Sequence, residues 1–336
     1  MNPIFSFGIQ LIQALQILSP ALDGVMQFFT FLGRVEFYLL LMPLIYWLVD
    51  AQLGMRVFLL LIGSNYITNG FKQLMRQPRP YWIGDVRGIG LETSYGLPSS
   101  HASDSLSIWG YLAYRVRTAW FWVLACTVIL LISLSRLYLG VHFPTDILGG
   151  WLTGLIAIFL LTTGERLLLP WLKKQSQASL IAISFSVSLA MILVGRLVIA
   201  LVASTPDPAS WAQFSTEART LTSSFSLAGA LFGGVAGYIL MLNHARFQVK
   251  RAVWQQAACY LLGIAGILLI YFGLDMLFAS IAADESVAGY TLRYIRYGTV
   301  CLWAMFGAPW AFLRVGLAEP VMKKTGPALA VQQGLA

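Results

Sequence analysis

The chain has 336 residues, of which 58% are hydrophobic and only 11% are charged. Soluble domains carry roughly 25% charged residues, so this composition excludes an ordinary soluble domain and indicates a polytopic membrane protein. The formal net charge of +8 does not indicate a nucleic-acid partner, because the basic residues are dispersed among apolar runs, as membrane topology requires. Cys126, Cys259 and Cys301 lie inside apolar runs, without the spacing of a metal site or a disulfide framework.

The first 33 residues are apolar but are interrupted by Pro20, Asp23, Gly24 and Gly33. We interpret residues 1–33 as interfacial helices that lie on the membrane; an additional span is the alternative. This segment lacks the basic region and the small-residue cleavage site of a removable signal peptide, so we expect the spans themselves to direct insertion.

Long apolar runs follow, and a membrane-spanning helix needs about 20 mostly apolar residues. We therefore predict an all-α polytopic membrane protein with about nine transmembrane helices. These helices are expected at residues 35–50, 53–75, 100–115, 119–138, 144–163, 179–202, 221–242, 253–274 and 294–314. We place a domain boundary at the loop that contains Pro170 and two lysines. This loop divides the chain into a membrane core that carries the polar segments described below (34–165), a cytoplasmic linker (166–178) and a four-helix C-terminal module of unknown role (179–336).

Positive charges in four short loops set the expected orientation, since Lys and Arg accumulate in cytoplasmic loops. These residues are Arg115 and Arg117; Arg166, Lys173 and Lys174; Arg246, Lys250 and Arg251; and Arg314, Lys323 and Lys324. With nine spans, all four loops lie on one side and the polar segments described next lie on the other. We expect an integral protein of a bacterial inner membrane with a periplasmic active site, although an endoplasmic reticulum lumen satisfies the same topology.

The first polar segment contains Lys72 and Arg79, where the prolines on either side of Arg79 prevent the preceding helix from continuing. Arg136, at the end of a later span, adds a third cation that can grip oxygens in bidentate fashion. Together these three side chains indicate a phosphate site. For Arg76 and Arg87 we prefer the simpler interpretation of charges that extend to the lipid headgroups.

The second polar segment is Ser99, Ser100 and His101, at the start of a predicted span. Free backbone N–H groups and the helix dipole favour an anion there, and Ser99 is also a plausible helix N-cap. His101 titrates near neutral pH and can serve as an acid or a base. Asp104, one turn further on, either tunes His101 or pairs with a nearby cation.

The third polar segment ends with His142 and Asp146, four residues apart at the start of the next span. This spacing lets the carboxylate reach one imidazole nitrogen and fix the tautomer, so that the other nitrogen is free to attack. A simple capping or solvated role for Asp146 is the weaker alternative.

The three segments read Lys-x6-Arg-Pro, Pro-Ser-x-His and Ser-Arg-x5-His-x3-Asp, and in this order and spacing they resemble the signature of the type-2 phosphatidic acid phosphatase (PAP2) superfamily. The resemblance covers roughly residues 20–165. Most members have glycine where this chain has Ser100. The serine variant looks like the form in sphingosine-1-phosphate and dolichyl diphosphate phosphatases, which hints at a long-chain substrate.

The resemblance implies a mechanism and assigns the residues. His142 would attack phosphorus to form a phosphohistidine, oriented by Asp146, and His101 would protonate the leaving oxygen and later activate water. The oxygens would be held by Lys72, Arg79, Ser99, Ser100 and Arg136. No cofactor or metal is expected, because the cations neutralise the developing charge.

Outside the signature, the sequence indicates mainly structural roles. Arg196, within a predicted span, is expected to pair with Asp275, either to tie the C-terminal spans together or to take part in substrate binding. Other charges border the outer loops of the C-terminal module and either line a lid or are solvated: Glu217, Arg219, Arg293 and Arg296. Aromatic residues near span ends are expected to be interfacial anchors: Trp82, Trp151, Trp211 and Tyr290.

The expected function is therefore a membrane lipid phosphatase that acts on a phosphomonoester or diphosphate, with the lipid substrate and membrane lipids as partners. A phosphotransferase using the same phosphohistidine is the closest alternative. A transporter built on a degenerate phosphatase scaffold is the alternative from another class, and a vanadium haloperoxidase is disfavoured because those members are soluble. The sequence leaves the lipid and the oligomeric state open.

Overall fold

The computed structural model describes residues 3–90, 92–215, 218–250 and 252–321. Glu217, Arg251, Lys323 and Lys324, which entered the sequence analysis, lie outside these ranges. The elements are α1 (Pro3–Gln16), α2 (Asp23–Phe31), α3 (Val35–Leu44), η1 (Ile45–Val49), α4 (Ala51–Met75), α5 (Pro80–Ile83), α6 (Ser100–Ser105), η2 (Leu106–Gly110), α7 (Tyr111–Val116), α8 (Ala119–Tyr138), α9 (Pro144–Leu172), α10 (Gln177–Val202), η3 (Ala212–Phe214), α11 (Thr222–His244), β1 (Phe247–Val249), α12 (Val253–Ala279), α13 (Val287–Leu302), η4 (Trp303–Gly307), α14 (Ala308–Arg314) and β2 (Ala318–Pro320). The two short strands pair antiparallel, with Gln248 opposite Glu319.

The protein is a helical integral membrane protein. In the described part of the chain, five helices are long and apolar enough to cross a membrane: α8, α9, α10, α11 and α12. A sixth span results if α2 and the continuous α3–η1 segment form one unit, which is bent by 51°. Short π-helical turns interrupt two of the other predicted spans, which become α6–η2–α7 and α13–η4–α14. The count of about nine spans stays a prediction.

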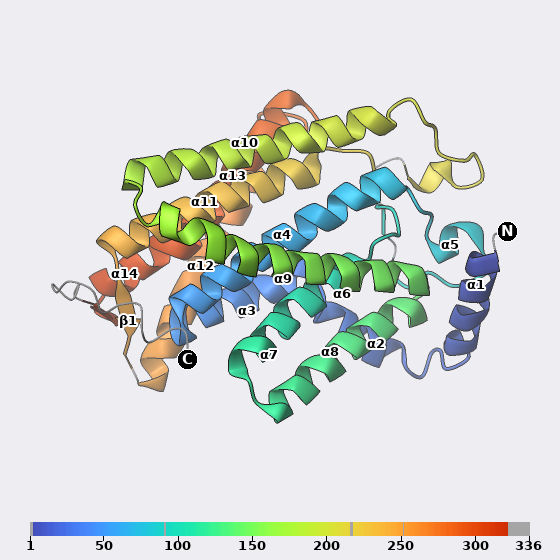
Figure 1. The fold of residues 1–336 in the computed structure, drawn as a ribbon, viewed down its shortest axis with the longest axis horizontal. Coiled ribbons are helices and arrows are strands. Elements are labelled where there is room, and N and C mark those ends of the chain that lie inside the picture. The colour runs from blue at the N-terminus through green and yellow to red at the C-terminus, as the bar shows by residue number, and fades with distance from the viewer. Residues whose placement is uncertain (1–2, 91, 216–217, 251, 322–336) are drawn as a thin grey trace.

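The long helices run between two opposite ends of the molecule (Figure 1). One end holds α5, the start of α9 and the loop that follows α10, while the other holds the end of α9, the start of α10 and β1. The main chain joins two of the polar segments at the first end, because Ser99 N–H donates to the carbonyl of Asp146 at 2.9 Å. The fold therefore gathers the polar segments at one end of the bundle.

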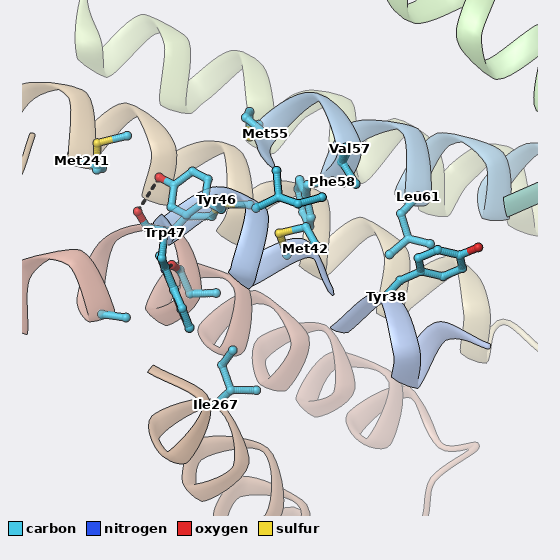
Figure 2. Close-up of a cluster of buried hydrophobic side chains, with 14 of the residues drawn as sticks. Tyr38, Met42, Tyr46, Trp47, Met55, Val57, Phe58, Leu61, Met241 and Ile267 are labelled. Carbon is cyan, nitrogen blue, oxygen red and sulfur yellow. Dashed lines mark hydrogen bonds between the residues drawn. The ribbon is translucent and has the colours of Figure 1, made fainter. Parts of the chain in front are cut away.

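The main apolar core joins α3, η1 and α4 to α11, α12, α13 and α14 (Figure 2). Two aromatic side chains of η1 anchor this contact through their polar atoms. The Tyr46 hydroxyl donates to the carbonyl of Met305 at 2.9 Å, and the Trp47 indole N–H donates to the carbonyl of Ala304 at 2.9 Å. Buried aromatic residues of this kind need such partners, and here the partners come from η4. Residues of α4 belong to the same core, so α4 also packs against the C-terminal helices.

Glycines let α11 and α13 approach each other closely. A Cβ atom added at Gly229 would lie 2.2 Å from the carbonyl oxygen of Tyr294, and one at Gly233 would lie 1.9 Å from that of Gly298. Small residues at such contacts are the usual way in which membrane helices maximise packing.

The N-terminal helices contact the polar end of the bundle. The Phe5 ring of α1 stacks on Phe143 with centroids 4.8 Å apart, and Thr30 of α2 accepts a hydrogen bond from Arg136. A Cβ atom at Gly33 would lie 2.9 Å from the His101 ring. Residues 3–33 therefore pack against residues of the three polar segments.

The glycine contact predicts a specific destabilisation. Gly233→Ala places a methyl group against the Gly298 carbonyl, and because backbone cannot yield there, we expect a loss of about 1–3 kcal/mol of stability. Thermal unfolding in detergent measures it. Gly273→Ala is the matched control, since no atom lies within 4 Å of its added Cβ. Equal midpoints for the two variants would contradict the close contact.

Candidate active site

Lys72 and Arg79 converge on one carbonyl group. Lys72, near the end of α4, is buried and donates its Nζ to the carbonyl of Tyr95. Arg79 is only 1% exposed, and its Nη2 donates to the same oxygen at 3.4 Å. Arg76 adopts the left-handed conformation (φ 47°) that ends α4, and Pro80 begins α5 directly after Arg79. The chain reversal between these two helices therefore brings the two cations together.

Arg79 also lies beside the imidazole of His142. Its Nε donates to the carbonyl of Ser94 at 2.6 Å, and its Nη1 donates to the carbonyl of Val141 at 2.9 Å. The same Nη1 lies 3.3 Å from Nε2 of His142. Neutral carbonyl groups thus hold the guanidinium in place without cancelling its charge.

His142 and Asp146 are both buried, and they meet as their spacing predicts. Nδ1 of His142 lies 3.2 Å from Oδ2 of Asp146, which also accepts the N–H of Phe143 at 2.9 Å and so caps α9. Burial, together with the charges of Arg79, Arg136 and Lys72, holds the pKa of His142 well below its ordinary value. The lowered pKa favours the neutral imidazole, whose Nδ1 faces the Asp146 carboxylate and whose Nε2 faces the Arg79 guanidinium.

Three other signature side chains have buried polar atoms without partners among the described residues. These atoms are Ser99 Oγ, His101 Nε2 and Arg136 Nε. Ser99 is the N-cap of α6, but its hydroxyl makes no capping bond, and Ser100 is the first residue of that helix. Buried polar atoms are normally hydrogen-bonded, and an unsatisfied one costs about 1–3 kcal/mol. Buried atoms without partners also occur elsewhere among the described residues, for example at Tyr38 and Trp109, but these three lie on side chains of the signature and could each bind a polar ligand.

Glu92 lies between two of the cations. Its carboxylate accepts a hydrogen bond from Arg136 Nη2, and it lies 3.5 Å from Arg79 Nη2. Burial raises the pKa of Glu92, but the charges of Arg136 and Arg79 outweigh it and hold this pKa below its ordinary value. An ionised carboxylate therefore occupies a position between the guanidinium groups that the sequence assigns to phosphate.

The sequence analysis missed Glu92. One signal was available, because three cations with a single carboxylate leave an excess of buried positive charge. Glu92 is an acidic residue in the loop that joins the first two polar segments.

Two arginines that were expected to reach lipid headgroups also make contacts within the protein. Arg76 donates to the carbonyl of Thr205 at 2.7 Å and lies 3.5 Å from Asp207. Arg87 pairs with Asp23 at 2.7 Å, and its side chain is 55% exposed. The headgroup interpretation of the two arginines stays a prediction.

The predicted role of Asp104 also changes. It accepts hydrogen bonds from Ser64 and from Asn65, the latter at 2.9 Å to each oxygen. These partners on α4 hold the carboxylate between helices. Asp104 therefore connects α6 to α4 rather than pairing with a cation. None of these hydrogen bonds joins Asp104 to His101, so its predicted influence on that histidine stays a prediction.

The expected pair of Arg196 with Asp275 is wrong, since the Asp275 carboxylate pairs with Arg296 of α13. The Arg296 guanidinium also lies over the rings of Tyr271 and Tyr297, at 5.0 and 5.3 Å from their centroids. These contacts tie α12 to α13, as a structural pair would.

The aromatic residues expected at the membrane interface differ in burial and in the contacts that they make. Trp82 and Trp211 are buried and stack on each other with centroids 5.7 Å apart, so the anchor interpretation is wrong for this pair. Trp151 donates to Ser133 at 3.1 Å, and Tyr290 stacks on Phe225 at 5.1 Å.

Two protein-family models match this chain. The family model described as "PAP2 superfamily" matches residues 53–170, and the one described as "PAP2 superfamily phosphatase, transmembrane extension" matches residues 225–320.

Three curated relatives show how far the similarity extends. Phosphatidylglycerophosphatase B of Bacillus subtilis is 30% identical over 44% of this chain and 77% of its own length. Lipid phosphate phosphatase delta of Arabidopsis thaliana is 32% identical over 40% of this chain and 36% of its own. Glucose-6-phosphatase 3 of Rattus norvegicus is 28% identical over 48% of this chain and 54% of its own. The chain thus spans about a third to a half of the length of the last two, whereas it spans most of the first. On these matches, the chain belongs to the PAP2 superfamily.

Proposed function

We propose that this protein is a membrane lipid phosphatase that hydrolyses a lipid phosphomonoester or diphosphate through a phosphohistidine. The main support is the buried pair of His142 and Asp146 next to Arg79, with Nδ1 of the imidazole occupied and Nε2 on the side of the guanidinium. Such an arrangement prepares a neutral imidazole to attack phosphorus while a cation holds the phosphoryl oxygens.

The proposed reaction has two steps. Nε2 of His142 forms a bond to phosphorus as the bond from phosphorus to the lipid oxygen breaks, and His101 gives a proton to that oxygen. Water then attacks the phosphohistidine while His101 takes a proton from this water. The bond from phosphorus to Nε2 breaks, which releases phosphate and restores both histidines. Lys72, Arg79 and Arg136 neutralise the charge on the oxygens in both steps, so the proposed chemistry requires no metal ion.

Ser99 and Ser100 complete the proposed phosphate site. They stand at the N-terminal end of α6, and the Ser99 hydroxyl has no partner among the described residues. Hydroxyl and backbone N–H donors at such a position suit phosphate oxygens.

We also propose the arrangement in the membrane. Nine spans result if α3–η1, α4, α6–η2–α7, α8, α9, α10, α11, α12 and α13–η4–α14 each cross once. The first five form the catalytic core (34–165), preceded by interfacial helices (1–33). A cytoplasmic linker (166–178) then leads to the C-terminal module (179–336). The active site faces away from the cytoplasm, into the periplasm of a bacterial cell, because the polar segments and the predicted positive loops belong to opposite helix ends.

A lipid is the proposed substrate class, supported by the names of two relatives, whereas the third is named for a sugar phosphate. Phosphate release from purified protein in detergent separates these classes when phosphatidic acid, phosphatidylglycerophosphate, a sphingoid phosphate, undecaprenyl diphosphate and glucose 6-phosphate are compared. The same assay with and without an added alcohol acceptor distinguishes hydrolysis from phosphotransfer.

Removal of the nucleophile gives the central prediction. His142→Ala should lower the turnover of the preferred substrate by at least about 10³-fold, because no other group can form the phosphoenzyme. A ³²P-labelled substrate should label wild-type protein with an acid-labile phosphate and leave the variant unlabelled.

His244→Ala is the matched control, since His244 is exposed at the end of α11. We expect it to retain wild-type turnover and labelling. Wild-type turnover by folded His142→Ala protein would refute the mechanism.

The environment of His142 predicts the pH dependence. Its pKa lies well below 6.5 because of burial and the nearby cations, and the nucleophile must be unprotonated. Lowering the pH should therefore reduce kcat/KM only well below pH 6.5, after correction for the substrate's own phosphate titration, measured by ³¹P NMR. An acid limb centred at or above pH 6.5 would show that the histidine is not held neutral.

Glu92 predicts an effect on anion binding. A phosphate group that enters between Arg136 and Arg79 must displace the Glu92 carboxylate, so Glu92→Gln should lower the inhibition constant of orthovanadate by about tenfold, or about 1.4 kcal/mol. Asp85→Asn, in the same loop, serves as the control and should leave this constant unchanged. Weaker inhibition of Glu92→Gln would mean that the carboxylate helps to bind the anion.

A further inference from the structure

The loop between α10 and α11, residues 203–221, contacts the loop that carries the phosphate-binding residues. Its Asp207 accepts hydrogen bonds from the hydroxyl of Tyr95 at 2.7 Å and from that of Ser215 at 2.8 Å. Arg219 of the same loop pairs with Asp207 at 2.7 Å, and its Nε donates to the Tyr95 hydroxyl at 2.9 Å. Tyr95 thus has both hydrogen-bonding functions of its hydroxyl satisfied by the C-terminal module.

Asp207 is suited to a fixed role because it remains ionised. Burial raises the pKa of Asp207, but hydrogen bonds from Tyr95, Arg219 and Ser215 outweigh this and lower it below its ordinary value. Its side chain is 8% exposed, so the carboxylate depends on these donors more than on water. Arg76 Nη1 also lies 3.5 Å from this carboxylate, and a charge held by several donors keeps those donors in one arrangement.

Aromatic packing reinforces the contact. The Trp82 ring stacks on Trp211 and on Phe214, with centroids 5.7 and 6.1 Å apart. The Tyr95 ring meets Trp211 edge to face at 6.3 Å, and Tyr95 is fully buried. Two residues of the catalytic half and two of the loop therefore share one cluster.

The main chain of Tyr95 faces the active site. Its carbonyl accepts hydrogen bonds from Lys72 Nζ and from Arg79 Nη2. Gln73, the residue after Lys72, donates in turn to the carbonyl of Ala218 in the loop between α10 and α11. The side chain of Tyr95 is thus held by the C-terminal module, while its carbonyl holds two cations of the phosphate site.

We propose that Asp207 and Arg219 are positioning residues, which act through Tyr95 to place Lys72 and Arg79, so that the C-terminal module completes the phosphate site. The proposal rests on the proposed phosphatase function and adds a role for the four helices that follow the signature. A displaced cation weakens its contact with phosphate oxygens, since such contacts depend on geometry.

Tyr95→Phe and Asp207→Asn test the proposal. Tyr95→Phe removes the hydroxyl but keeps the ring and the carbonyl. We expect each variant to raise the inhibition constant of orthovanadate, and the KM of the preferred substrate, by about tenfold. The double variant should be no worse than the stronger single variant, because both remove the same connection. Arg219→Lys should lose less than Arg219→Ala, since it keeps the charge beside Asp207.

Asp284→Asn is the matched control. Asp284 lies in the loop between α12 and α13, in the same C-terminal module, and pairs with Arg293 of α13 at 3.4 Å. We expect wild-type inhibition and KM for this variant, and thermal unfolding midpoints within a few degrees for every variant compared.

The outcomes separate the two proposals. If wild-type protein hydrolyses substrate and His142→Ala does not, but Tyr95→Phe binds orthovanadate as wild type does, the positioning role is refuted and the function stands. If Asp284→Asn weakens inhibition as much as Asp207→Asn, the effect is a general loss of stability and the positioning role is again refuted. If wild-type protein neither releases phosphate nor binds orthovanadate, the proposed function itself fails.

Discussion

Three buried cations govern the structure around the active site. Lys72, Arg79 and Arg136 are each less than 5% exposed, and an unpaired buried charge costs several kcal/mol. The chain meets this demand chiefly with neutral acceptors, the carbonyls of Tyr95, Ser94 and Val141. Carbonyl partners satisfy the hydrogen-bonding groups of these cations without neutralising them, so the site keeps a net positive charge, as the proposed phosphate site requires.

The two carboxylates near the cations have separate tasks. Asp146 is bound to His142 and to the N–H of Phe143, which leaves it orienting the imidazole. Glu92 instead contacts Arg136 and Arg79, between the guanidinium groups of the proposed phosphate site. The Glu92 side chain lies on a loop and is 30% exposed, whereas Asp146 lies in the first turn of a long helix.

The C-terminal helices pack against the half of the chain that contains the candidate active site. Tyr46 and Trp47 of η1 bind carbonyls of η4, and α4, whose last turn contains Lys72, contributes to the same apolar core as the C-terminal helices. At the polar end, Trp82 and Tyr95 contact the loop between α10 and α11. Contacts at the core and at the outer end therefore connect the active-site residues to the module at both ends of α4.

The spacing of neighbouring residues in the sequence was sufficient to predict much of the local geometry of the site. Asp146 is the third residue of α9 and reaches back toward the residues just before the helix, so its meeting with His142, which precedes the N-cap, follows from the local sequence. The prolines around Arg79 and the N-cap position of Ser99 likewise depend only on neighbouring residues. Composition alone indicated a helical membrane protein, since apolar runs of such length have few other uses.

Partners distant in the chain were decided by tertiary packing. Glu92 between two arginines, Asp275 with Arg296, and Tyr95 with Asp207 join residues on different loops or helices. Which long side chains meet depends on how helices pack and where their connecting loops fold back, and hydropathy does not encode either. The sequence thus determined the chemical groups and their local geometry, whereas only the folded bundle decided which charges they face, because a buried charge takes whichever partner the packing brings within reach.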